Sequence, residues 1–223
     1  MSIDVEKDVM WKKIVVRTFI VLGVIIIAFV GIVAMQPNDF RVERSAKIAA
    51  PAADVFAQVN DFHKWEAWSP WLKVDPNSKG TYEGPSEGKD AVFRWAGNEN
   101  VGEGSMTITV SQPSDVIRIK LHFLKPFEDT ATTEFTFKPE GDQTVVTWSM
   151  FGDNTFVEKA FCLFMNMEKM IGDKYEEGLA SMKAVVESRE PIEKTSDGEP
   201  AGQAAASGKR RRAGSISDRS KGK

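Results

Sequence analysis

The sequence has 223 residues, of which 42% are hydrophobic and 27% charged, and its formal net charge is −3. A chain of this length holds one ordinary domain with additional segments, and its slight negative charge argues against a nucleic-acid-binding protein that works through overall charge. The single cysteine, Cys162, excludes an internal disulfide framework and multi-cysteine zinc or iron–sulfur sites. Because His63 and His122 are the two histidines, we expect no bound metal and no cofactor.

An apolar run lies near the N-terminus. Residues 18–35 carry no charged side chain, and residues 14–16 extend the run. About 18 helical residues, at roughly 1.5 Å each, suffice to cross a bilayer core. We therefore expect an uncleaved transmembrane anchor over 14–35, after a short segment over 1–13. A cleaved signal peptide and a buried core helix are the alternatives, but the run exceeds the usual signal core of about 7–15 residues and no clean cleavage motif follows.

The basic residues that flank this run bear on its orientation. They are Lys7, Lys12, Lys13 and Arg17 before it and Arg41, Arg44 and Lys47 after it. The positive-inside rule counts basic residues, so the small excess before the run favours a cytoplasmic N-terminus. We expect a single-pass protein of the plasma (inner) membrane, with the large domain on the opposite side.

Residues 40–190 have the size of a single folded domain. A helix is expected over 52–60, after Pro51, and an aromatic segment over 65–71 follows it. Alternation of apolar and polar residues indicates strands with one wet face. The predicted strands cover 41–48, 80–83, 91–95, 102–110, 116–124, 130–138 and 144–151.

A long amphipathic helix is expected at the end of this domain. Thr155 and Glu158 have the spacing of a capping box, and an apolar stripe of helical period continues to Val186. Gly172 weakens the middle of this helix, so we expect a kink or a restart at Asp173. Cys162 lies beside the stripe, and we expect it to be a buried, unreactive thiol.

The last segment, 191–223, is poor in apolar residues and is expected to be disordered. Its end, 207–223, has seven basic residues and one acid, which gives a charge of +6. This segment is either a solvated tail or a segment that is attracted to an anionic surface such as lipid headgroups.

Several short motifs occur in the order found in a known superfamily. They are Arg44–Ile48, Ala50-Pro51-Ala52, Val55-Phe56, Asp61–Trp65, Trp68–Trp71, Asp75-Pro76, Trp95-x-Gly97-Asn98, Gly102-x-Gly104, Thr147-Trp148 and Gly178-Leu179. With this order of elements, residues 40–188 resemble the START-like helix-grip (SRPBCC) superfamily, in its polyketide cyclase/dehydrase-like branch. The resemblance implies an α+β fold, in which a seven-stranded antiparallel sheet grips a long C-terminal helix.

The resemblance also implies an apolar cavity between the sheet and the helix, because the family binds lipids, polyketides and other hydrophobic molecules. Simple core packing is the alternative for each residue, and the tryptophans of 65–71 either contact a ligand or plug one end of the grip. The candidate ligand-binding residues are Trp68, Trp71, Phe93, Trp95, Met106, Leu121, Phe123, Phe135, Phe137, Trp148, Met150, Phe161, Met165 and Tyr175.

Residues for catalysis are few. No metalloprotease, nucleophile-elbow or Walker motif is present in the sequence. A cyclase would need an acid or base in the cavity, for which Tyr82, Glu83, Arg94 and Glu103 are weak candidates, so catalytic residues stay unassigned. The favoured hypothesis is a membrane-anchored, non-catalytic binding domain for a hydrophobic small molecule or lipid, with no nucleic acid as partner. The alternatives are a cyclase- or dehydratase-like enzyme and a protein-interaction or co-chaperone module.

Overall fold

The computed structural model describes residues 2–188, so the tail expected over 191–223 lies outside the described residues. The first element is a long helix, α1 (Ser2–Ala34), which begins well before the predicted apolar run. Its stretch Met10–Ala34 is long and apolar enough to cross a membrane, and the most apolar part of it is not buried in the protein. This exposure argues against a buried core helix and is compatible with both an anchor and a signal sequence.

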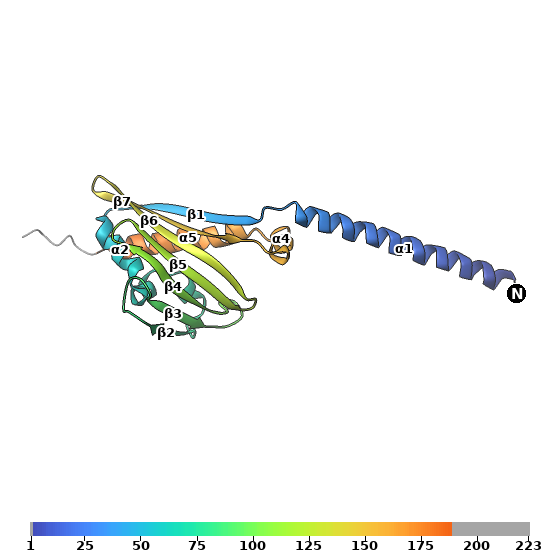
Figure 1. The fold of residues 1–223 in the computed structure, drawn as a ribbon, viewed down its shortest axis with the longest axis horizontal. Coiled ribbons are helices and arrows are strands. Elements are labelled where there is room, and N and C mark those ends of the chain that lie inside the picture. The colour runs from blue at the N-terminus through green and yellow to red at the C-terminus, as the bar shows by residue number, and fades with distance from the viewer. Residues whose placement is uncertain (1, 189–223) are drawn as a thin grey trace, which may run out of the picture. The chain divides into compact units, whose positions relative to one another are not determined.

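One antiparallel sheet forms the body of the domain (Figure 1). Its strands lie in the order β1-β7-β6-β5-β4-β3-β2, so the first strand of the chain pairs with the last. This confirms the predicted seven-stranded antiparallel sheet. The strands are β1 (Asp39–Ile48), β2 (Lys79–Glu83), β3 (Val92–Ala96), β4 (Glu103–Gln112), β5 (Val116–Lys125), β6 (Asp129–Glu140) and β7 (Gln143–Asp153).

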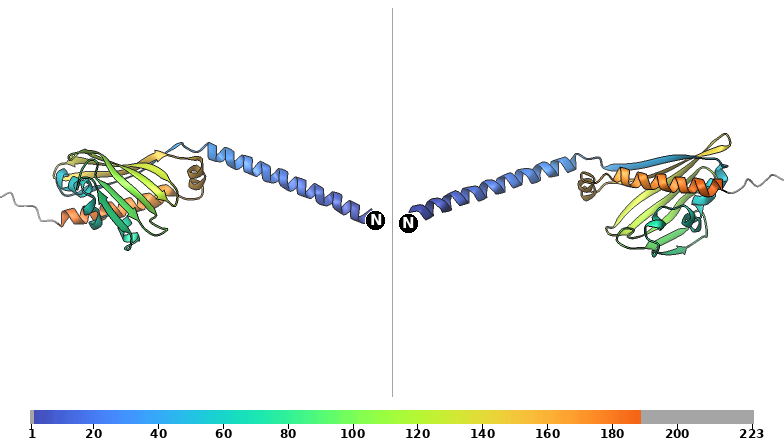
Figure 2. Two further views of the ribbon diagram at one scale, coloured as in Figure 1. Left: turned by 60° about the horizontal axis from the view of Figure 1, so that its bottom comes forward. Right: turned by 180° about the vertical axis from the view of Figure 1, so that it is seen from behind.

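The other elements of the domain are helical. They are α2 (Ala52–Asn60), the 3₁₀ helix η1 (Phe62–Ala67), α3 (Trp71–Val74), α4 (Phe156–Cys162) and α5 (Met167–Glu187). Of these, α2 and α5 lie against one face of the sheet. The long helix α5 packs against β1 and β7 and also contacts α2 and η1 (Figure 2). The sheet and α5 therefore form the predicted helix-grip arrangement.

The two faces of the sheet have different surroundings. We call the face that α5 covers the inner face and the opposite one the outer face. In β6, Ala131, Thr133, Phe135 and Phe137 are buried on the inner face, and the residues between them are less buried. Successive side chains of a strand point to opposite faces, which explains this alternation.

The two ends of the sheet also differ, because one of them lies next to α1. At this end, which we call the anchor end, Asp39 pairs with Asp153 and Phe123 pairs with Asp129. Four residues separate the end of α1 from the start of β1. At the far end, β1 finishes at Ile48.

The C-terminal helix is interrupted earlier than the sequence predicted. The capping box of Thr155 and Glu158 is present and starts α4, but the helix stops at Cys162. Asn166 then caps α5, accepting a hydrogen bond from the Lys169 amide, and α5 continues through Gly172 without a restart. The expected restart at Asp173 is wrong, because α5 is continuous there; a β-carbon at residue 172 would clash with the Arg44 guanidinium, so this glycine allows close packing of α5 on β1.

The early interruption also exposes the first part of the apolar stripe. Cys162 is exposed rather than buried, and so are Val157, Phe161 and Phe164. These residues lie on α4 and just after it, outside the part of the stripe that faces the sheet.

Candidate ligand-binding site

Aromatic rings fill the centre of the grip. Trp148 of β7 stacks on Tyr175 of α5 and on Phe135 of β6, with ring centroids 3.9 and 4.8 Å apart. Trp65 and Trp68 approach these rings edge-on from η1 and from its C-terminal cap. All five side chains are buried, so this aromatic cluster closes the central part of the grip.

Hydrogen bonds fix the two indoles of Trp65 and Trp68. The indole N–H of Trp65 donates to the Val59 carbonyl at 3.0 Å, and that of Trp68 donates to the Gln58 carbonyl at 3.2 Å. Buried indoles need such partners, and here the end of α2 supplies them. Of the tryptophans considered for a pocket rim, Trp65 and Trp68 lie in the core, whereas Trp71 on α3 is 38% exposed.

The anchor end of the grip is filled less completely. Phe40, Trp95, Met106 and Phe123 lie on the inner face, yet each is only half-buried. Trp95 and Phe123 pack edge to face with centroids 5.9 Å apart. Half-buried apolar side chains on the face toward α5 offer a surface for an apolar ligand.

The fold brings most of the residues proposed from the sequence together. Phe93, Trp95, Met106, Leu121, Phe123, Phe135, Phe137, Trp148 and Met150 all lie on the inner face of the sheet, with Tyr175 opposite them on α5. Phe161 and Met165 lie apart from this set, on α4 and in the segment after it, and both are exposed. Their assignment to a ligand stays a prediction.

Sequence reasoning missed Phe40 and Met167, which pack at the edge of the core near the anchor end. Phe40 precedes the predicted first strand, and its register opposite Gly152 depends on pairing between the first and last strands. Met167 belongs to the first turn of α5, whose start was not predicted. Phe40 carried no local signal, whereas Met167 lies within the long helix that the sequence predicted.

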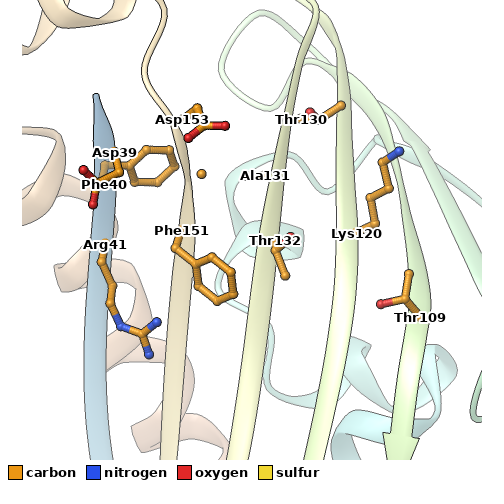
Figure 3. Close-up of a pocket in the computed structure, with 11 residues that line it drawn as sticks. Asp39, Phe40, Arg41, Thr109, Lys120, Thr130, Ala131, Thr132, Phe151 and Asp153 are labelled. Atoms are coloured by element: carbon orange, nitrogen blue, oxygen red, sulfur yellow. The ribbon is translucent and has the colours of Figure 1, made fainter. Parts of the chain in front are cut away.

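A hollow of about 650 Å³ lies on the outer face at the anchor end (Figure 3). Arg41, Lys120 and Phe151 line it together with threonines 109, 130 and 132. The Arg41 guanidinium lies 5.2 Å from the centroid of the Phe151 ring and is paired with Glu43 at 2.8 Å. This hollow is open and is lined by both polar and apolar residues, Phe40 among them, and none of the residues proposed from the sequence lines it.

Charged groups near α5 have a structural role. Arg44 bonds Glu168 at 2.9 Å and Glu176 at 2.7 Å, and these two hydrogen bonds raise the pKa of the guanidinium. Because Arg44 belongs to β1 and both carboxylates belong to α5, the three side chains tie the helix to the sheet beside Gly172.

Of the weak catalytic candidates, Glu83, Arg94 and Glu103 lie on the outer face, whereas Tyr82 pairs with Phe93 on the inner face, at the edge strand β2. Glu83 pairs with Arg94 at 2.8 Å, Glu103 pairs with Lys125 at 2.8 Å, and Tyr82 stacks on His63. These pairs lie at the surface rather than in a shared site.

Tyr175 is a buried ionisable group within the aromatic cluster. Burial raises the pKa of its phenol above the ordinary value, so the group stays protonated at neutral pH and does not act as a base. Within residues 2–188, no group of three or more histidine, cysteine, aspartate or glutamate side chains is arranged to hold a metal ion.

Comparison with protein families gives a match over residues 39–187, to the family described as polyketide cyclase / dehydrase and lipid transport. The comparison with curated proteins returned no match.

Solved structures give further matches. A protein from Thermobifida fusca is 20% identical with a TM-score of 0.51, over 66% of this chain and 93% of its own. Protein MLL2253 from Mesorhizobium loti is 10% identical with a TM-score of 0.50, over 67% and 98%. Protein CV1439 from Chromobacterium violaceum is 15% identical with a TM-score of 0.46, over 68% and 99%.

The first two similarities show the shared fold, and the family match covers more than half of the chain, including all seven strands and α5. The chain therefore belongs to the polyketide cyclase/dehydrase and lipid transport family, within the helix-grip SRPBCC superfamily.

Proposed function

We propose that this chain is a membrane-anchored protein that binds a hydrophobic small molecule or lipid without chemically changing it. The observation that carries the proposal is the short junction between the apolar helix and the folded domain of this chain. The family match begins at residue 39, and an apolar helix of 25 residues ends at Ala34. A helix of that length is about 37 Å long, more than a bilayer core of roughly 30 Å requires.

The proposed ligand surface is the inner face at the anchor end. Phe40, Trp95, Met106 and Phe123 supply apolar area there, whereas the aromatic cluster occupies the centre of the grip. Binding sites for small molecules are mostly apolar with few polar groups, and the half-buried side chains of this face are apolar. Met106 also adapts its shape to different ligands because its side chain is unbranched.

The surroundings of this surface support binding rather than catalysis. General acid–base chemistry requires a titratable group within hydrogen-bond reach of the reacting atom. At the described inner face, Arg44 is held by two carboxylates of α5, and the Tyr175 phenol is stacked within the aromatic cluster. Asp129, the partner of Phe123 in the sheet, is the titratable group beside the half-buried apolar residues, and it is the residue to replace in a test for turnover.

Photocrosslinking tests where a lipid binds. The full chain is reconstituted in phosphatidylcholine vesicles that contain a trace of phospholipid with a diazirine in its acyl tail, and adducts are mapped by peptide mass spectrometry. We expect adducts near Phe123 and Met106 in addition to those on α1. Phe123→Gln should reduce the adducts in the domain, whereas Phe151→Gln, a half-buried phenylalanine on the outer face, should not. Adducts on α1 alone would contradict lipid binding in the grip.

A second measurement tests the anchor. We expect the full chain to remain in the membrane fraction after extraction at alkaline pH, with its N-terminal residues still present in the intact mass. A chain that begins after residue 35, or one released by the extraction, would identify α1 as a cleaved signal or as a peripheral segment.

A further inference from the structure

Large apolar side chains gather on α4 and the segment that follows it. Phe156, Val157, Phe161 and Phe164 are exposed, and Phe164 exposes 79% of its surface. Val157 and Phe161 are four residues apart in α4, so helical geometry places them on one side, and Phe164 follows in the turn after the helix. A row of exposed aromatic side chains of this kind marks an interaction surface.

The end of β5 and the loop between β5 and β6 present a second apolar group at the same end of the sheet. Leu124 is 47% exposed and Phe127 is 72% exposed. Because Phe123 pairs with Asp129, this loop lies at the anchor end, where β7 also ends and leads into α4. Two separate segments therefore expose apolar side chains at one end of the domain.

Short connections hold α4 close to the exit of α1. The Asn154 amide donates to the Asn38 carbonyl at 2.6 Å, and the Lys159 ammonium of α4 bonds the Asn38 side chain. Asn38 lies four residues after Ala34, a distance that an extended chain spans in at most about 14 Å. The position of α4 relative to the end of the apolar helix is thus limited by covalent length and by hydrogen bonds.

A direct contact also joins the two elements. The rings of Phe29 in α1 and Phe164 stack with centroids 6.2 Å apart. Phe29 lies five residues before Ala34, so its depth from the end of the helix is about 7.5 Å. Apolar faces of interfacial helices are buried by a comparable 5–10 Å or so at the boundary of headgroups and acyl chains.

We propose that α4 and the β5–β6 loop insert into the interfacial layer of the same bilayer that α1 crosses. This proposal rests on α1 being an anchor, as proposed above. The contact would orient the anchor end of the grip, with its half-buried Phe40 and Phe123, toward the lipid, so that an apolar ligand passes between bilayer and protein without crossing water.

The charges at this end indicate which lipid surface fits. Asp39, Asp129, Asp153 and Glu158 lie at the anchor end, where the Lys125 ammonium is paired with Glu103 and the Lys159 ammonium is buried against Asn38. Carboxylates are repelled by anionic headgroups, so we expect insertion to be driven by apolar contact. The matching surface is an uncharged phosphatidylcholine interface.

Cys162 provides a direct probe, because it is exposed on α4 and is the single cysteine of the chain. The full chain is labelled at Cys162 with an environment-sensitive nitrobenzoxadiazole and reconstituted in phosphatidylcholine vesicles with nitroxide lipids of defined depth. We expect a blue-shifted emission and quenching mainly by the shallow nitroxide. Adding phosphatidylserine should not increase the quenching.

Two control positions are introduced in a Cys162→Ser background. Gly23→Cys lies within the apolar helix, where an added β-carbon meets nothing within 4 Å, and it should be quenched mainly by the deep nitroxide. Asp142→Cys lies in the exposed turn between β6 and β7 at the far end, and it should not be quenched. Quenching at Gly23→Cys with none at Cys162 would overturn this inference and leave the anchor intact. Loss of quenching at Gly23→Cys would instead contradict the anchor, and this inference with it.

Substitutions on the surface test the cause of the insertion. Phe161→Asp combined with Phe164→Asp should abolish the quenching and the blue shift at Cys162, because charged side chains disfavour the interface. Both positions are exposed, so the fold is expected to persist, as checked by near-ultraviolet circular dichroism. Val74→Asp is the matched control at an exposed apolar residue of α3, beside the C-terminal half of α5, and should leave the quenching unchanged. Unchanged quenching in the double variant would also overturn the proposal.

Discussion

The centre of the grip and its anchor end are built from similar residues but in different states. In the centre, Trp68, Phe135 and Trp148 are almost fully buried and pack ring against ring. At the anchor end, Phe40 and Phe123 belong to the same face of the same sheet, yet they stay half-buried. The difference follows from coverage: α2, η1 and α5 close the centre, whereas α4 presents its aromatic side chains outward.

This contrast separates residues that hold the fold from residues that are available to a partner. A side chain in the centre contributes its full burial to stability. One at the anchor end contributes less, and its apolar area remains available to a ligand or a bilayer. The following substitutions test that separation in the full chain held in detergent micelles.

The largest effect is expected for Trp68→Ala. Removing a fully buried indole leaves a cavity, which lowers the free energy of unfolding by about 3–5 kcal/mol. Denaturant unfolding followed by far-ultraviolet circular dichroism measures the change. Trp71→Ala, at the neighbouring exposed tryptophan, is the control and should cost less than about 1 kcal/mol. Equal losses for the two variants would show that the centre is not the packed region.

A smaller loss is expected for Thr133→Val in the same region. The Thr133 hydroxyl accepts a hydrogen bond from the Trp148 indole at 2.9 Å and donates to the Ser149 carbonyl at 2.8 Å. Without it, the buried indole N–H loses its partner, which costs about 1–3 kcal/mol. Thr132→Val, the adjacent residue on the outer face, should be close to neutral. If both valine variants unfold at the same denaturant concentration, the hydrogen bond contributes nothing.

At the anchor end, Phe123→Ala should cost about 1–2 kcal/mol, since the ring is only partly removed from water. The same unfolding measurement applies. A loss as large as that of Trp68→Ala would mean that the two regions do not differ in packing, and it would weaken the assignment of the anchor end to a ligand.

The smallest effect concerns Asp129, at the start of β6. Burial raises the pKa of its carboxyl, and the neighbouring Glu158 carboxyl raises it further, against the Thr130 amide, which lowers it. Because the pKa is raised in the folded state, folding favours the protonated carboxyl. As the pH rises through the folded-state pKa, Asp129 ionises and the protein loses stability. Asp129→Asn should therefore raise the unfolding midpoint at pH 7, with the advantage disappearing below about pH 4.

Asp142→Asn, in the exposed turn at the far end, is the matched control for this experiment. It should leave the midpoint unchanged over the same range of pH. If Asp129→Asn keeps its advantage in acid, its effect is not caused by ionisation.

The sequence was informative wherever the signal was local. Alternating residues predicted all seven strands to within two residues at each end, and the spacing of Thr155 and Glu158 predicted the start of α4. The resemblance of residues 40–188 to a known superfamily then supplied the single antiparallel sheet that grips the C-terminal helix, whereas the order of the strands in it comes from the structure. The family match over 39–187 agrees with that extent.

The sequence was misleading where the outcome depended on contacts between distant residues. Gly172 has the low helix propensity of any glycine, but the Arg44 side chain lies against it and needs the space of a missing β-carbon. Likewise, the apolar stripe from Val157 to Phe164 has the period of a buried helix. These residues are exposed because the helix stops at Cys162 and a new helix, α5, begins after Asn166.

The sequence by itself thus determined the strands, the apolar helix and the inner-facing set of side chains, because pleat and helical period are properties of neighbouring residues. Only the tertiary structure decided which of those side chains are buried in the aromatic cluster and which stay half-buried. It also brought the exposed aromatics of α4, the β5–β6 loop and the exit of α1 to one end. Burial and proximity are properties of the whole folded chain, because they depend on which elements cover each other.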